Sequence, residues 1–286
     1  MGGRAVATAV LALALVAGGA AACAEPSDDD LRTRSAEADA AYGRIIEALY
    51  GTPEQSVTAT DRVDALLQQG IAECMRRAGF GYPTIPPQHL AAPIVVVGDL
   101  TSVAPLGADF RIAAYRRSVA EAADRTRRAD TSPKTEAAYA AIGRCGSAVQ
   151  TPESFAPSGR EQLASELERM LVALEREPAA AAKLAAYGGC MRHAGFDASD
   201  YTQLYQLIEA TFPDASAGWA ELAADPRWAA AEDFEHRAAA ADATCRAELH
   251  HHVMAAAQPV LAGFEARHAV ALAALRRAWA EPPTGP

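Results

Sequence analysis

The stretch IAECMRRAGFGYP, residues 71–83, returns later in the chain as YGGCMRHAGFDAS, residues 187–199. CMRRAGF and CMRHAGF agree at six of seven positions. Each phrase follows apolar residues at spacings of three and four, which is typical of a helix. Glycine favours the left-handed conformation that ends a helix, and a residue just beyond it packs back on the last turn. Each phrase is therefore predicted to end a helix, with Cys74 and Cys190 pointing inward.

Each phrase has a later cysteine on another predicted helix, Cys145 after the first and Cys245 after the second. The simplest pairing is Cys74–Cys145 and Cys190–Cys245, with one disulfide in each half of the chain. Four cysteines allow three connectivities, so the sequence alone leaves the pairing open.

The composition favours helices throughout. Much of the 50% hydrophobic content is alanine, the strongest helix former, and aromatic residues make up only 6%. We expect an all-α protein, a multi-helix bundle of two pseudo-repeat halves at residues 31–157 and 158–281. A thin, alanine-rich core gains from covalent links.

Local signals set the expected ends of several helices. Ser27 is predicted to cap the first helix and Thr60 the second. The sequence SGRE, which begins at Ser158, matches a capping box. Pro259 is expected to kink or split the last helix.

Residues 1–22 have the pattern of a secretory signal: Arg4, an apolar run over residues 5–17 and a spacer of small residues. Residues 23–30 are expected to form a tether, and residues 282–286 a disordered tail.

Cys23 follows the expected signal directly, in the sequence AAAC. This resembles the lipobox of bacterial lipoproteins, although Ala20 stands where leucine is usual. Ala20 and Ala22 also form a site for ordinary signal cleavage at the same bond. The chain has five cysteines, and an odd thiol in an oxidising compartment needs an explanation. A lipid on Cys23 would leave four cysteines for two disulfides.

The formal net charge of −10 disfavours attraction to nucleic acid. No nucleic-acid partner is expected. A lipid on Cys23 would bind the membrane, and another envelope protein is the other expected partner.

Four groups of polar or aromatic side chains are candidates for a functional site. The run His250–His252 would need His193 or His236 to hold a metal, since adjacent residues on a helix point in different directions. Glu232, Asp233 and Glu235 are expected on a solvated face. Asp242, if buried, needs a cationic partner such as Arg76, Arg192 or Arg246. The aromatic side chains Trp219, Trp228, Tyr201 and Tyr205 are expected either in the core or along a partner groove.

Two CMxxxGF phrases, the later cysteines and a final ADxxC helix (Ala241, Asp242 and Cys245) resemble a group of uncharacterised actinobacterial secreted proteins and lipoproteins. The resemblance spans roughly residues 40–280 and implies an envelope location. It implies no established activity, so no catalytic, metal or cofactor residue is assigned.

The sequence thus predicts a lipid-anchored, extracytoplasmic helical protein that binds or scaffolds at the cell envelope. Activity as an enzyme is the less favoured expectation. The alternative is an envelope metal-binding protein or enzyme that uses the histidine cluster.

Overall fold

The computed structural model describes residues 27–83, 90–91, 100–107, 110–129, 135–150, 157–214 and 218–280. All regular secondary structure in these ranges is helical, so the predicted all-α class is confirmed. The helices are α1 (Asp28–Tyr50), α2 (Pro53–Arg77), α3 (Ile112–Ala129), α4 (Glu136–Ala148), α5 (Arg160–Glu175), α6 (Pro178–His193), α7 (Tyr201–Glu209), α8 (Trp219–Ala224) and α9 (Pro226–Ala280). None of these helices is long and apolar enough to cross a membrane.

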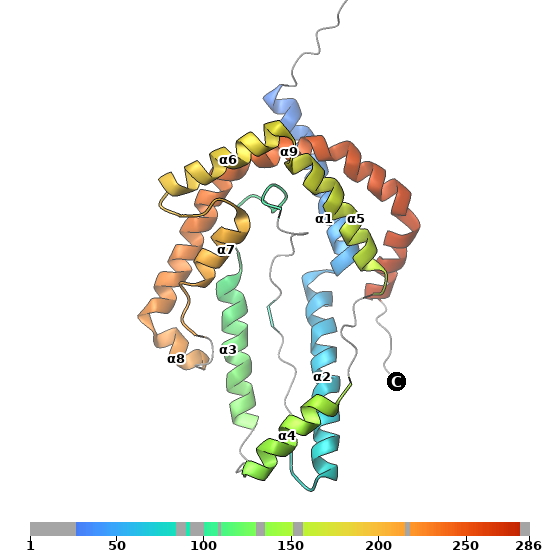
Figure 1. Ribbon diagram of the computed structural model, residues 1–286, viewed down its shortest axis with the longest axis vertical. Coiled ribbons are helices and arrows are strands. Elements are labelled where there is room, and N and C mark those ends of the chain that lie inside the picture. Colours follow the sequence, from blue (N-terminus) through green and yellow to red (C-terminus); the bar gives the residue numbers. More distant parts are fainter. Residues whose placement is uncertain are drawn as a thin grey trace, which may run out of the picture.

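The 55-residue helix α9 organises the structure. It arches across one end of the molecule, and α1, α5 and α6 lie against it, whereas α2, α3 and α4 extend away from the arch (Figure 1). Two apolar clusters share α9: one joins it to α1 and α5, and the other joins it to α3, α6, α7 and α8. Burial along two separate stretches of one helix links the clusters into a single framework.

A third, much smaller cluster holds α2 against α4. Its fully buried members are Ile71, Met75, Ala141 and Cys145. Because these few apolar side chains bury little area, they stabilise the packing of α2 on α4 only weakly. The disulfide between Cys74 and Cys145 therefore contributes most of the stabilisation of this pair of helices. In the loop-closure model that disulfide contributes about 4 kcal/mol.

Both copies of the repeated phrase end their helices as predicted and with the same hydrogen bonds. In the first copy, Phe80 N–H donates to Met75 O and Gly79 N–H to Arg76 O, and Gly79 has a φ of 81°. The second copy repeats both bonds at Phe196 and Gly195, where φ is 92°. This pattern is a Schellman motif, which uses carbonyl groups that the helix end leaves free.

The repetition does not extend beyond these helix ends. Cys74 is joined to the short helix α4, whereas Cys190 is joined to α9. Helix α1 belongs to the predicted first half, yet it packs along α9 of the second half. The two halves therefore share a core.

Two predicted helix starts were wrong, that of α2 by about two helical turns and that of α5 by one residue. Helix α2 begins earlier than expected, because Thr52 and Gln55 form a reciprocal capping box ahead of Pro53. Thr60 lies inside the helix, where its hydroxyl donates to Ser56 O.

Helix α5 begins one residue later than the expected capping box. Its N-cap is Gly159, in the left-handed conformation with a φ of 85°, and no side chain caps it. Glycine adopts that conformation without strain, so Gly159, and not Ser158, is the N-cap residue.

Ser27 does cap α1, with its hydroxyl accepting from Asp30 N–H. Asp28–Asp30, assigned to the tether, therefore form the first turn of α1. Residues 1–26 and 281–286 lie outside the described ranges, and with them the expected signal, Cys23 and the tail.

Pro259 was expected to kink or split α9, but the helix continues through it. The residue with non-helical angles is His268, with φ −106° and ψ 15°. Proline lacks an N–H, so the carbonyl of Ala255, four residues earlier, loses its helical donor. Arg34 of α1 replaces that donor, with its Nη2 3.1 Å from Ala255 O. A contact from the neighbouring helix thus supports the proline inside α9.

We predict that Arg34→Met lowers the free energy of unfolding by about 1 kcal/mol, because Ala255 O then lacks a donor. In a Pro259→Ala background the restored N–H satisfies that carbonyl, and the same substitution should cost much less. Chemical denaturation of the four variants of this double-mutant cycle measures the difference. Arg32→Met, on an exposed position of α1, is the control. Equal costs in both backgrounds would contradict the pairing.

Candidate functional site

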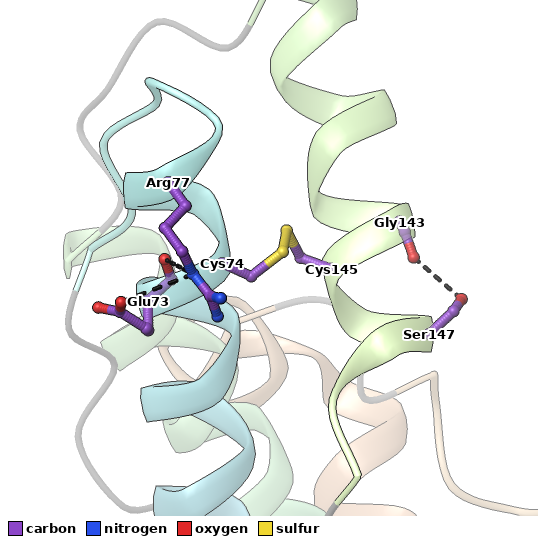
Figure 2. The surroundings of a disulfide bond; sticks show 6 residues. All are labelled: Glu73, Cys74, Arg77, Gly143, Cys145 and Ser147. Atoms are coloured by element: carbon purple, nitrogen blue, oxygen red, sulfur yellow. Dashed lines mark hydrogen bonds and ion pairs between the residues drawn. A yellow bond between two sulfur atoms is a disulfide. The ribbon is translucent and has the colours of Figure 1, made fainter.

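The four predicted cysteines form the two disulfides of the simplest pairing. The Cα–Cα distance is 5.6 Å in Cys74–Cys145 and 5.6 Å in Cys190–Cys245. Cys145 is buried against α2, and Figure 2 shows the first disulfide bridging α2 and α4. Cys190 was expected to point inward but is exposed at the end of α6, where it is joined to Cys245 of α9. Both bonds are consistent with an oxidising, extracytoplasmic environment.

The most buried charged side chain of the described residues is Arg246, which lies on α9 and faces the segment of residues 100–107. Arg246 has no exposed surface, and Asp242, one turn earlier, is 2% exposed. Their side chains form an ion pair with a distance of 2.6 Å between Arg246 Nη2 and Asp242 Oδ2. Of the three cationic partners weighed for Asp242, the structure places Arg246 there.

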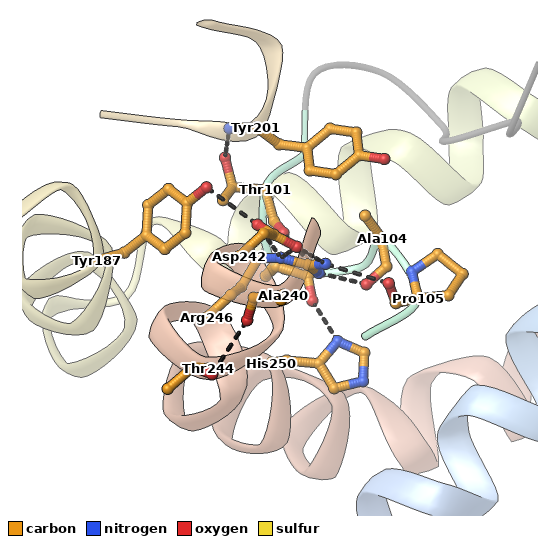
Figure 3. A network of polar contacts seen from close by, with 11 residues as sticks. Thr101, Ala104, Pro105, Tyr187, Tyr201, Ala240, Asp242, Thr244, Arg246 and His250 are labelled. Carbon is orange, nitrogen blue, oxygen red and sulfur yellow. Dashed lines mark hydrogen bonds and ion pairs between the residues drawn. The ribbon is translucent and has the colours of Figure 1, made fainter. Parts of the chain in front are cut away.

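Arg246 also binds the backbone of residues 100–107. Its Nη1 donates to Thr101 O at 3.2 Å and to Ala104 O, and its Nη2 donates to Pro105 O at 3.1 Å (Figure 3). Guanidinium has five donors in a fixed fork, so one buried arginine can hold several carbonyls. The network therefore fastens this segment to α9.

Helix α6 joins the same network through Tyr187. Its hydroxyl donates to Asp242 Oδ1 at 3.0 Å. Burial, followed by the charge of Asp242, raises the pKa of Tyr187 far above its ordinary value. Burial also raises the pKa of Tyr201, which lies over the Arg246 guanidinium, to about 12. Both phenols stay neutral at physiological pH, so they add no charge to the network, and Tyr187 contributes a hydrogen-bond donor to Asp242.

The histidine run is divided among different contacts. Nδ1 of His250 is 2.8 Å from Ser102 O, and Nε2 is 3.1 Å from Asp39 of α1. His251 contacts Ser35 Oγ at 3.2 Å. The described residues contain no group of three histidine, cysteine or acidic side chains placed to hold a metal ion. The run therefore connects α9 to its neighbours.

The acidic residues of α9 also have separate structural roles. Glu235 is buried and accepts from the N–H groups of Ile112 and Ala113 at the start of α3, at 2.8 and 3.0 Å. Asp233 forms an exposed ion pair with Arg237. Glu235 was expected on the solvated face and lies instead in the core, because it supplies the acceptors that α3 needs at its N-terminus.

Of the four aromatic side chains considered for a partner groove, Trp228 is buried, and Trp219, Tyr201 and Tyr205 are partly buried against the same apolar cluster. Trp228 is 4% exposed, and Phe212 and Trp219 contact it edge to face, each with ring centroids 5.2 Å apart. Tyr201 stacks on Phe110 at 5.0 Å. The few large rings of this chain fill the space that alanine leaves.

A pocket of about 570 Å³ lies beside the first half of α2. One face of that helix forms a wall, and residues before α3 form the other. The lining residues are Pro53, Glu54, Val57, Thr58, Asp61, Arg62, Ala65, Leu90, Ala91 and Arg111.

The pocket combines apolar surface with charges of both signs. Glu54 and Asp61 supply carboxylates, and Arg62 and Arg111 supply guanidinium groups. The pKa of Glu54 is lowered by its own backbone N–H and by Thr52, and also by the charge of Arg111. Arg111 has a φ of 60°, which is rare for a residue with a side chain. Such strained backbone tends to occur at functional sites.

Sequence reasoning missed Asp39, the segment of residues 100–107 and the pocket. The proline-rich character of residues 81–107 indicates only that no continuous helix forms there. No periodic signal links Thr101 or Pro105 to a helix more than 140 residues later. The residues of α2 that line the pocket recur at helical spacing. Their mixture of charged and apolar side chains, however, is also what an ordinary half-exposed helix face contains.

Comparison with known proteins found no matching family model, no matching curated protein and no matching solved structure. The class of protein therefore follows from the structure itself: an all-α protein with two disulfides, a buried arginine network and a candidate pocket beside α2.

We predict that Arg246→Met lowers the free energy of unfolding by roughly 3–5 kcal/mol, because the substitution leaves the buried Asp242 carboxylate and three carbonyls without a cation. Arg237→Met is a matched control. Arg237 pairs with Asp233 at the same four-residue spacing on the same helix, but these side chains are 62% and 69% exposed. Its loss should cost less than about 0.5 kcal/mol. Urea denaturation monitored by circular dichroism compares the two, and equal costs would contradict the network's role.

Proposed function

We propose that this chain is an extracytoplasmic binding protein that is anchored to the cell membrane by a lipid on Cys23. Its helical body presents the pocket beside α2 to a ligand or to another envelope protein. The observation that carries the proposal is the pairing of the cysteines. Four of them form two disulfides, which leaves Cys23 as the unmatched residue of five.

The cysteine pairing supports an envelope location in two ways. Disulfides persist in oxidising compartments, and a secreted chain with an odd cysteine needs a use for it. Lipidation directly after residues 1–22 gives Cys23 that use. Helix α1 begins at Asp28, so only a few residues would separate the lipid from the folded body.

The pocket supports binding over catalysis. Its apolar lining suits an apolar group, and its paired charges suit a ligand or peptide that carries both signs. The best-organised polar groups of the described structure lie elsewhere and are occupied with holding helices together. The contacts of His250 and His251 leave the metal-binding alternative without a supporting arrangement.

The anchor is tested by following the full-length protein in a bacterial host that processes lipoproteins. The wild type should fractionate with membranes and carry a labelled fatty acid. Cys23→Ala should lose the label and be released, because Ala20 and Ala22 still provide an ordinary cleavage site. Cys23 is outside both disulfides, so the released variant should fold normally. An unlabelled, released wild type would contradict the anchor.

Binding is tested with a photo-crosslinking amino acid at Thr58, an exposed position in the pocket lining. We expect a discrete higher-mass product in intact cells. The same group at Val270, which is 84% exposed at the far end of α9, is the control and should give none. Products of equal yield at both positions, or none at either, would contradict a binding role for the pocket.

A further inference from the structure

The two disulfides differ in their access to solvent. In the exposed disulfide, Cys190–Cys245, Cys190 is exposed at the end of α6 and Cys245 is half-buried on α9. In the covered disulfide, Cys74–Cys145, Cys145 is 2% exposed and Cys74 is half-buried against the same small apolar cluster. Thiol–disulfide exchange requires a thiolate to reach one of the two sulfur atoms, so access limits its rate. An external thiol can therefore approach the exposed disulfide from the side of Cys190.

The surroundings of the two disulfides also differ, at equivalent positions of the repeated phrase. In the first copy, Arg76 pairs with the neighbouring Glu73 at 2.6 Å. In the second copy, Gly189 stands in place of that glutamate, and a Cβ there would meet no atom of another segment within 4 Å. Arg192 is exposed and forms no ion pair with another described residue. A thiolate is an anion, so it is attracted to the exposed disulfide and repelled by Glu73 at the covered one.

Helix α6 stays attached to α9 without the exposed disulfide, because buried side chains also join the two helices. Tyr187 of α6 has no exposed surface, and its hydroxyl donates to Asp242 of α9 at 3.0 Å. Just beyond α6, the ring of Phe196 contacts that of Phe234 edge to face, with centroids 5.3 Å apart. Opening of the exposed disulfide therefore leaves its two thiols close together, and they can pair again.

The covered disulfide has much less support from its surroundings. Among the described residues, the buried members of its cluster besides Cys145 are Ile71, Met75 and Ala141. Opening of this bond removes most of what holds α4 on α2, because so small a cluster contributes little burial energy. The covered disulfide is therefore structural, whereas the exposed disulfide can open within the folded protein.

We propose that Cys190–Cys245 is a site of thiol–disulfide exchange with an external protein dithiol. A thiolate of the dithiol attacks Sγ of Cys190 and forms a mixed disulfide, while Sγ of Cys245 leaves with the bonding electrons and takes up a proton. The second thiol of the dithiol then loses its proton and displaces Cys190, which leaves as a thiol. The dithiol is oxidised to a disulfide, and the two cysteines are reduced by the same two electrons.

The attack is directed to Cys190 because its partner is screened. Cys245 lies against the apolar cluster that joins α9 to α6, α7 and α8, and it is followed in the chain by the completely buried Arg246. The external thiol therefore becomes attached to α6, and the thiol of Cys245 stays on α9. The exchange site does not depend on the lipid anchor or on the pocket beside α2.

Limited reduction of the folded protein compares the two disulfides. Any free thiol at Cys23 is first blocked with N-ethylmaleimide. Dithiothreitol is then added, samples are quenched with iodoacetamide over time, and mass spectrometry locates the label, since trypsin places the remaining four cysteines on separate peptides. We expect Cys190 and Cys245 to be labelled at least about tenfold faster than Cys74 and Cys145.

The same reaction in urea is the matched control. An unfolded chain exposes both disulfides equally, so their rates of reduction should converge. In the absence of urea, the helical circular dichroism should persist while the exposed disulfide opens. A rate difference that is unchanged in urea, or loss of the helical signal together with this opening, would contradict the proposal.

Glutathione, a monothiol, shows which sulfur atom is attacked. The expected product at early times carries glutathione on Cys190 and the iodoacetamide label on Cys245. The proposal is overturned if glutathione is found on Cys245 instead, or if the covered disulfide opens first or at the same rate. It is also overturned if neither disulfide opens before the protein unfolds.

Discussion

The arrangement of this protein depends on one buried cation. Arg246 has no contact with solvent, and a dehydrated guanidinium is stable in a protein only when its charge and its donors are satisfied. Asp242 supplies the charge, and the carbonyls of residues 101, 104 and 105 accept from the remaining donors. The same interaction determines where residues 100–107 lie, and these residues in turn receive α7, because Tyr201 N–H donates to Thr101 Oγ1.

Alanine explains why polar contacts carry so much of the architecture. An alanine side chain buries little area, so helices of this composition approach closely but gain modest hydrophobic energy. The chain compensates with two disulfides and with side chains that form hydrogen bonds to backbone groups of other segments. Arg34 serves Ala255 O, Glu235 serves the start of α3, and Arg246 serves residues 100–107. Each contact positions one element on α9, which is why a single long helix can organise the rest.

The success of the sequence-based predictions follows from the range of the forces involved. The Schellman ends at Gly79 and Gly195 were predicted because glycine, apolar spacing and the following Phe act within one turn. The predicted helix starts at Thr60 and Ser158 were wrong because another local cap is used in each case. Helix α2 uses the capping box at Thr52, and α5 uses the left-handed turn at Gly159. The prediction that Pro259 would kink or split α9 failed for a different reason. The carbonyl of Ala255, which the proline leaves without a donor, accepts from Arg34, more than 200 residues earlier in the chain.

The sequence by itself determined the helical class and the helix ends of the repeated phrase, because propensity and turn chemistry are local properties. It left three disulfide connectivities open, and the tertiary structure selected the simplest of them. Only the tertiary structure decided that Arg246 is the partner of Asp242, that Asp39 faces His250, and that one wall of a pocket is a face of α2. Those facts depend on which distant segments meet. Periodicity identifies the inward face of a helix but not the residue that lies opposite it.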